Sequence, residues 1–135
     1  MILLDTDVLI DVALDRPGHA DAAARLLSLL EGRPRMAFVA WHTLSNFYYL
    51  VSPTQGRDDA REFLVELTRF VSVAPTDTEA LHYAAFLPLG DFEDALQVAA
   101  ARACGAKYIA TRNVKDFRQS PIPARKPEDL VAELE

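Results

Sequence analysis

The sequence is poor in cysteine and in long apolar runs, and each shortage excludes a class of protein. Cys104 is its only cysteine. A single thiol rules out an intramolecular disulfide and a zinc site built from cysteines, and it suits a reducing compartment. We therefore expect a cytoplasmic protein rather than a small secreted domain held together by disulfides.

No segment has the length and apolar character of a membrane helix, which needs about 20 consecutive apolar residues. The longest stretch without an acidic or basic side chain, residues 36–56, is interrupted by polar residues such as His42 and by Pro53. The first eleven residues are largely apolar, but they include three aspartates, a density that a secretory signal would not tolerate. We expect neither a targeting segment nor a membrane partner.

Positive charge is also scarce, since 14 basic residues stand against 20 acidic ones and the net charge is −6. This balance argues against a protein that binds nucleic acid through bulk electrostatic attraction. The distribution is uneven, however, because residues 102–127 contain seven of the 14 basic residues and only one acid, Asp116. One region of the chain is therefore locally basic.

Short apolar segments alternate with segments of helical spacing along the chain. Segments 2–4, 37–39, 70–73 and 107–110 predict buried strands. Helices are predicted at 7–14, 20–30, 43–51, 57–70, 77–85 and 91–104 and from residue 127 onward, with Pro53 and Gly105 ending two of them. This order predicts an α/β fold with a parallel sheet covered on both faces. The length suffices for a single domain over residues 1–135.

Aspartates stand where the predicted topology would bring them together. Ligands of an open parallel sheet gather beyond the carboxyl ends of its strands, where Asp5 and the loop carrying Asp116 are expected. Asp91 and Asp94 share one face at the start of a helix. Carboxylates that meet raise one another's pKa unless a cation neutralises them, and Mg²⁺ or Mn²⁺ prefers such oxygen ligands. The pattern therefore favours metal-assisted phosphodiester hydrolysis.

Each of these acids also has a purely structural interpretation. Asp5 and Asp7 can cap a helix that follows a strand, and the spacing of Asp91 and Asp94 is typical of a capping pair. Asp116 can be a solvated loop residue. Two aspartates at the end of an apolar strand are nevertheless costly unless they are used, which favours function for Asp5.

Four segments, taken in order, resemble the PIN-domain family: LLDTDVLID from Leu3, TLSNFYY from Thr43, DFEDALQ from Asp91 and TRNVKDF from Thr111. The chain is similar above all to a bacterial branch close to the VapC-type toxin ribonucleases of toxin–antitoxin pairs. The resemblance implies a three-layer sandwich with a central parallel sheet of four or five strands. It also implies Mg²⁺ or Mn²⁺, cleavage of RNA, an antitoxin partner and a homodimer.

Carried over by position, the resemblance makes Asp5, Asp94 and Asp116 the catalytic acids and the main metal ligands. Asn46 stands where the better-known nucleases of the family have a glutamate, and this loss of one charge implies weaker metal binding. Asp7 and Asp91 would be auxiliary ligands. The supporting residues would be Thr6, Asn46, Thr111, Arg112 and Asn113.

Two other functions remain open at this stage. The order Asp5-Thr-Asp7-Val and the segment Gly90–Asp94 resemble motifs of haloacid-dehalogenase-like phosphatases, in which Asp5 would be phosphorylated. The glycine and threonine expected after the second aspartate are absent, however. The third possibility is a catalytically weakened PIN module that binds RNA or a partner through the basic region without cleavage.

Overall fold

The computed structural model describes all of residues 1–135. Five parallel strands form one sheet in the order β3-β2-β1-β4-β5. Along the chain the strands are β1 Ile2–Leu4, β2 Ala37–Val39, β3 Val71–Val73, β4 Tyr108–Ala110 and β5 Ala124–Arg125. The first strand of the sequence is therefore the central strand of the sheet.

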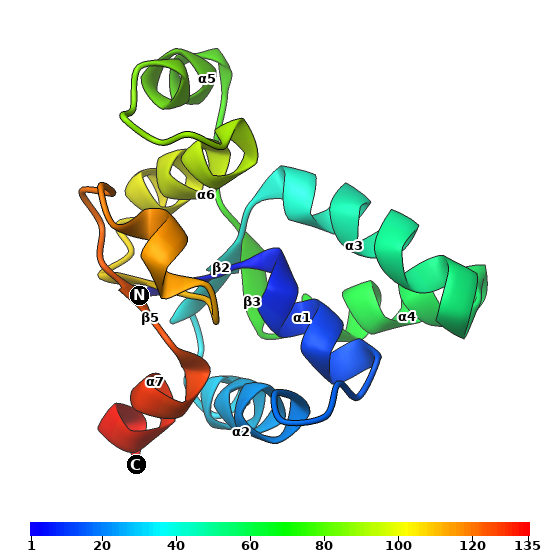
Figure 1. Ribbon diagram of the computed structural model, residues 1–135. Helices are drawn as coiled ribbons and strands as arrows, with labels where there is room; N and C mark the ends of the chain where they lie inside the picture. The colour runs from blue at the N-terminus through cyan, green and yellow to red at the C-terminus, as the bar shows by residue number, and fades with distance from the viewer.

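Seven α-helices and one short 3₁₀ helix connect and cover the strands (Figure 1). The helices are α1 Thr6–Ala13, α2 Ala20–Glu31, α3 Trp41–Gln55, α4 Arg57–Leu67, α5 Thr78–Ala85, α6 Phe92–Ala103 and α7 Pro127–Leu134. The 3₁₀ helix η1 is Val114–Phe117. Helices α5 and α6 lie on one side of the sheet, and α1, α2, α3, α4 and α7 lie on the other. The predicted three-layer α/β sandwich is thus confirmed.

The central strand β1 is buried on both faces, as a parallel strand between helical layers must be. Successive side chains of a strand point to opposite faces, so Ile2 and Leu4 join the larger apolar core while Leu3 joins the smaller one. Phe47 of α3 is fully buried in the larger core, and Val98 of α6 is fully buried in the smaller one. Both cores fix the end of β1 from which Asp5 follows.

The structure corrects the predicted end of one helix and adds one strand. The helix predicted to end before Pro53 continues through it to Gln55. Proline has a helical φ and lacks only one hydrogen-bond donor, and here it lies in the last turn, where Gly56 N still bonds to Ser52 O at 2.9 Å. The strand β5 was not predicted from the sequence, because two residues are too short to display a hydrophobic period.

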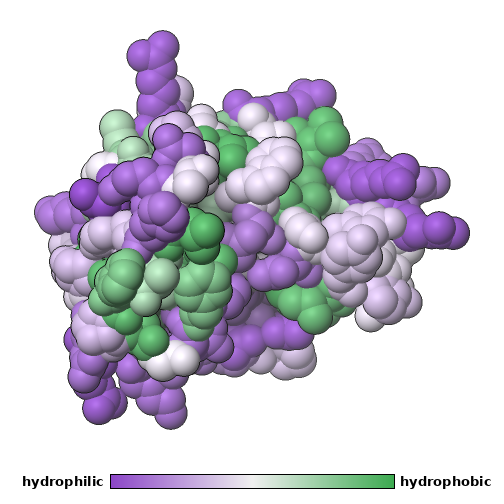
Figure 2. All heavy atoms as spheres, turned by 90° about the horizontal axis from the view of Figure 1, so that it is seen from above, coloured by the Kyte–Doolittle hydropathy of each residue, from purple (hydrophilic) through white to green (hydrophobic).

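None of the helices combines the length and the apolar composition needed to cross a membrane. Figure 2 shows the face on which α5 lies, where green hydrophobic patches are interspersed with purple hydrophilic side chains. Exposed apolar side chains in this part of the chain are Leu81 of α5, Phe86, which follows α5 and is 89% exposed, and Phe92, the first residue of α6. This face therefore carries apolar surface that the chain itself leaves uncovered.

Candidate active site

The carboxyl ends of the two central strands bring the first polar side chains of the site together. Leu4 of β1 pairs with Ala110 of β4, so that Asp5 and Thr111 directly follow paired residues. Asp5 caps α1 by accepting a hydrogen bond from Thr6 N at 2.8 Å, and the hydroxyl of Thr111 donates to its Oδ2 at 2.9 Å. The predicted cap is therefore real, and it also holds the Asp5 carboxylate at the sheet edge.

A cavity of about 270 Å³ lies at this edge, and we call it the acidic pocket. Its polar lining residues are Asp5, Thr6, Asp7, Arg16, Asn46, Glu93, Asp94 and Asn113. They come from the start of α1, from the segment that follows α1, from α3, from the first turn of α6 and from the loop after β4. The structure thus brings Asp5, Asp7 and Asp94 to one cavity and places Asn46 in its wall.

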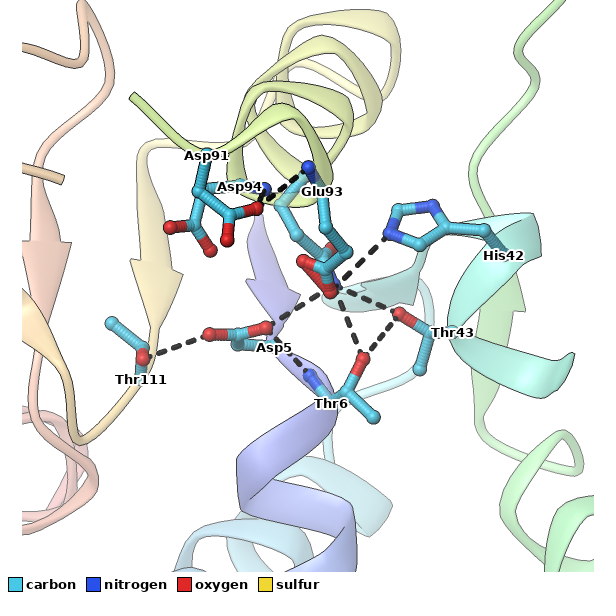
Figure 3. Close-up of polar contacts among 9 residues, drawn as sticks. Asp5, Thr6, His42, Thr43, Asp91, Glu93, Asp94 and Thr111 are labelled. Atoms are coloured by element: carbon cyan, nitrogen blue, oxygen red, sulfur yellow. Dashed lines mark hydrogen bonds and ion pairs between the residues drawn. The ribbon is translucent and has the colours of Figure 1, made fainter. Parts of the chain in front are cut away.

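The first turn of α6 adds a cluster of three carboxylates (Figure 3). One side-chain oxygen from each of Asp91, Glu93 and Asp94 lies within 4.8 Å of the others. Asp91 also caps α6, because its Oδ1 accepts hydrogen bonds from Glu93 N at 2.8 Å and Asp94 N at 3.2 Å. Its capping role is established by this geometry, and the remaining oxygen, Oδ2, is not engaged by the cap.

Burial and mutual repulsion raise the pKa of the carboxyl groups in the acidic pocket. The pKa of Asp5 is raised from 3.8 to about 8, first by burial and then by the charges of Asp7 and Glu93. Burial likewise raises the pKa of Asp7. The pKa of Asp94 is raised to about 6 by burial and by neighbouring acids, Asp91 first among them. Without a cation, Asp5 therefore retains its proton at neutral pH.

Two hydrogen-bonding details show that the pocket suits a divalent cation. Thr111 has one hydroxyl proton but contacts two carboxylate oxygens, Asp5 Oδ2 at 2.9 Å and Asp7 Oδ2 at 3.1 Å. Asp7 Oδ1 is buried and has no hydrogen-bond partner. An unsatisfied buried oxygen beside other carboxylates is costly, and a cation with oxygen ligands would satisfy it. The residues present therefore fit Mg²⁺ or Mn²⁺.

The structure places Asp116 beside the acidic pocket rather than in its lining. It lies exposed on η1 and lines a neighbouring cavity of about 310 Å³ together with Gly90 and Lys115. Its charge still contributes to the raised pKa of Asp94, so the two carboxylates are close enough to interact. Of the three acids predicted to converge, Asp5 and Asp94 thus line the acidic pocket, whereas Asp116 lines the neighbouring cavity.

The supporting residues predicted after β4 hold Asp7 in place. Its Oδ2 accepts hydrogen bonds from the backbone N–H of Arg112 at 3.3 Å and from the side-chain amide of Asn113 at 3.1 Å. The side chain of Arg112 turns away and donates to Asp11 Oδ2 at 2.8 Å. Asp11 is buried, and its hydrogen bond to Arg112, together with its charge, raises the already high pKa of Arg112.

Sequence reasoning missed Gln97, which is fully buried behind the pocket. Its Nε2 lies 3.1 Å from Asp5 Oδ1, 3.3 Å from Thr6 Oγ1 and 3.0 Å from Thr43 Oγ1. Asp5 therefore accepts hydrogen bonds from Thr6, Gln97 and Thr111 together. A glutamine among the alanines of a buried helix face was the available signal, because a polar residue there requires partners.

Glu93 and the Asp11 ion pairs were also missed. Glu93 lines the acidic pocket, and its Oε1 lies 3.6 Å from His42 Nε2. Asp11 Oδ2 accepts a hydrogen bond from Arg112 Nε at 2.8 Å, and this ion pair links α1 to the loop after β4. Asp11 Oδ1 also lies 3.5 Å from Arg16 Nη1. Glu93 had a sequence signal in its position next to Asp94, whereas the contact between Asp11 and Arg112 spans 101 residues and had none.

Comparison with known families identifies the chain. The model of the PIN domain family matches residues 1–115, so the chain belongs to the PIN domain family. The family resemblance that the four motifs predicted is thus confirmed. A comparison with curated proteins gave no match.

Solved structures of VapC-type proteins have the same fold. VapBC2 from Rickettsia felis, bound to a DNA fragment from its promoter, has a TM-score of 0.71 and 20% identity over 93% of this chain and 98% of that one. DNA-bound VapBC from Salmonella typhimurium has a TM-score of 0.71 and 18% identity, covering 93% and 97%. VapC20 of Mycobacterium tuberculosis, a toxin that cleaves the sarcin–ricin loop, has a TM-score of 0.65 and 18% identity, covering 81% and 87%.

Proposed function

We propose that the chain is a divalent-metal-dependent endoribonuclease that hydrolyses RNA phosphodiesters. The observation that carries this proposal is the gathering of Asp5, Asp7, Glu93 and Asp94 around one pocket in a member of the PIN domain family. Their raised pKa values, together with the unsatisfied Oδ1 of Asp7, support a site that binds a cation.

Asp5, Asp7 and Asp94 would hold Mg²⁺ or Mn²⁺, with Asp91 and Asp116 as outer acids at the rim. Held by these residues, such a cation would supply Lewis-acid chemistry: polarisation of a phosphoryl oxygen and a lowered pKa for a coordinated water. No protein side chain needs to act as the nucleophile. The cation identity follows from the all-oxygen character of these side chains, since no cysteine or histidine lines the pocket.

The chain's own residues would orient the Asp5 and Asp7 carboxylates before substrate arrives. Three donors fix Asp5: the backbone of Thr6, the amide of Gln97 and the hydroxyl of Thr111. Asn113 and the backbone of Arg112 fix Asp7 in the same way. Ligands held in one orientation lose little entropy on binding a cation, so these contacts favour a preorganised site.

We further propose that the protein is the toxin of a toxin–antitoxin pair and forms a homodimer. The solved structures with this fold include VapBC complexes, which supports a small protein partner. The exposed side chains of Phe86 and Phe92 support association with another chain, because exposed apolar surface often marks interaction sites. A protein pair of this kind would act in the cytoplasm.

A cleavage assay tests the nuclease. Purified protein is incubated with a fluorescently labelled single-stranded RNA and either Mn²⁺ or Mg²⁺, and products are resolved on a denaturing gel. We expect cleavage that EDTA abolishes and that Asp94→Asn lowers at least about 100-fold, because the variant loses a charged ligand. Asp58→Asn, an exposed acid of α4, is the matched control and retains activity. Equal cleavage by both variants would contradict the site assignment.

The two competing functions are outcomes of related measurements. RNA binding without cleavage in any divalent metal would favour the weakened binding module. A phosphorylated Asp5 trapped with acetyl phosphate would favour the phosphatase, which the match to the PIN domain family does not support.

A further inference from the structure

A second cavity, of about 730 Å³, lies beside the acidic pocket and has the opposite charge. Four cationic side chains line it, and no acidic residue does. We call it the basic cavity. Its polar lining residues are Arg112, Asn113, Lys115, Arg118, Ser120 and Lys126. These residues belong to the segment that concentrates half of the chain's basic residues.

Three of the four cations have no acidic partner. Arg112 is paired with Asp11 at 2.8 Å, but Lys115, Arg118 and Lys126 form none of the ion pairs of the structure. All three are exposed. Unpaired like charges around a concave surface produce a locally positive potential, even though the net charge of the protein is −6. Such a surface attracts a polyanion rather than a small neutral ligand.

The basic cavity adjoins both parts of the candidate active site. Asn113 lines the basic cavity and also the acidic pocket, where it donates a hydrogen bond to Asp7. Lys115 and Arg118 line the basic cavity and also the groove that contains Asp116. A strand whose phosphate is held at the acidic pocket therefore needs to pass only Asn113 to reach the cations.

We propose that the basic cavity binds the sugar–phosphate backbone of the substrate RNA on one side of the cleaved bond. This inference rests on the proposed function, since it names the surface along which that nuclease holds its strand. Lysine and arginine side chains that contact phosphates position a nucleic acid without reading its bases. The basic cavity therefore increases the affinity for RNA and sets the path of the strand, and its contribution to binding is sensitive to salt.

A binding experiment with matched charge variants tests the proposal separately from catalysis. The background is Asp94→Asn, and the probe is a fluorescent single-stranded RNA followed by anisotropy at several salt concentrations in EDTA. The test variant adds Arg118→Gln and Lys126→Gln. The control adds Arg57→Gln and Arg61→Gln, which remove the same charge from α4, where these two arginines line a different cavity.

We expect the test variant to bind RNA about tenfold more weakly than the control. Its plot of log affinity against log salt should also be less steep by about 1.4, because a single strand contributes about 0.7 per phosphate contact. Thermal unfolding of both variants establishes that they are folded. Equal affinities and equal salt slopes in the two variants would overturn the proposal.

Activity measurements with the native Asp94 distinguish this proposal from the proposed function. Arg118→Gln with Lys126→Gln should lower kcat/KM for RNA mainly through KM, whereas Arg57→Gln with Arg61→Gln, on α4, should leave the KM for RNA unchanged. An unaltered KM for RNA would contradict the basic cavity as a binding surface. Failure of the unsubstituted protein to cleave any diester would instead contradict the nuclease, while the anisotropy experiment still decides the binding surface.

Discussion

Replacing Asp5 by asparagine should make the metal-free protein more stable at neutral pH while removing a metal ligand. Asparagine keeps the shape of the side chain. Its carbonyl oxygen can accept from Thr6 N and Gln97 Nε2, and its amide can donate to the Thr111 hydroxyl, which also has lone pairs. The substitution therefore removes the ionisable group, so that folding no longer requires protonation of this side chain, and retains the hydrogen bonds.

The magnitude follows from the raised pKa of Asp5. The folded protein retains this proton up to about pH 8, whereas the unfolded chain loses it near pH 3.8. The favourable contribution is fully present below the unfolded pKa and is lost as pH rises through the folded pKa. Relative to Asp5→Asn, the free energy of unfolding of the native chain should therefore fall by about 1.4 kcal/mol per pH unit between pH 5 and 7.

Urea unfolding in EDTA at pH 5, 6, 7 and 8 measures this difference. Excess Mn²⁺ at pH 8 should raise the stability of the native chain and not that of Asp5→Asn, because the cation binds the ionised carboxylate. The exposed-site variant Asp58→Asn should follow the native chain at every pH. A difference between the native chain and Asp5→Asn that stays constant from pH 5 to 7 would refute the buried, protonated Asp5.

Three other predictions follow from the contacts around the pocket. Gln97→Leu leaves Asp5 Oδ1 without one of its two hydrogen-bond donors. We therefore expect the Mn²⁺ affinity to fall about tenfold in a calorimetric titration, and the free energy of unfolding to fall by about 1–3 kcal/mol. Unchanged Mn²⁺ affinity would show that Gln97 does not position Asp5. Asp11→Ala leaves Arg112 and Arg16 without their buried partner, which should cost about 2 kcal/mol in urea unfolding, and a cost near zero would show that the ion pair is dispensable. The pKa of Asp94 is about 6 and that of Asp5 is about 8, so Mn²⁺ binding should strengthen from pH 5 to 8 and release protons. Calorimetric titrations in buffers of different ionisation enthalpy measure the number of protons released. Binding that is independent of pH would contradict both pKa values.

Local signals were sufficient for most of the fold. The segment Ile2–Leu4 is wholly apolar because it is buried between two helical layers, and Asp5, which follows it, marked the edge of the sheet at which the acidic pocket lies. The strand β5 escaped detection, since its two residues Ala124–Arg125 pair with β4 only once the chain has turned after η1. Such pairing is decided by tertiary contacts rather than by hydrophobic period.

The same division between local and distant information holds for the pocket. Asp91 and Asp94 could be assigned to one helix face from their spacing alone. The approach of Thr111 to Asp5 could be inferred only from the parallel order of the strands, and it was. The contacts of Gln97 could not be inferred, because its three partners lie 54 to 92 residues away in the sequence and the local pattern does not indicate which residues they are. Buried polar networks are fixed by packing, which a single sequence does not display.

The position of Asn46 bears on how strongly the pocket binds a cation. The family resemblance places a glutamate there in active nucleases, so its replacement suggested a site short of one charge. The structure puts Glu93, from α6, at the same pocket that Asn46 lines, together with Asp5 and Asp94. With Asp7, the pocket therefore still has four carboxylates. Glu93 of α6 supplies the carboxylate that α3 lacks because Asn46 stands in place of a glutamate. Metal affinity in this chain should accordingly depend on Glu93, whose charge also contributes to the raised pKa of Asp5.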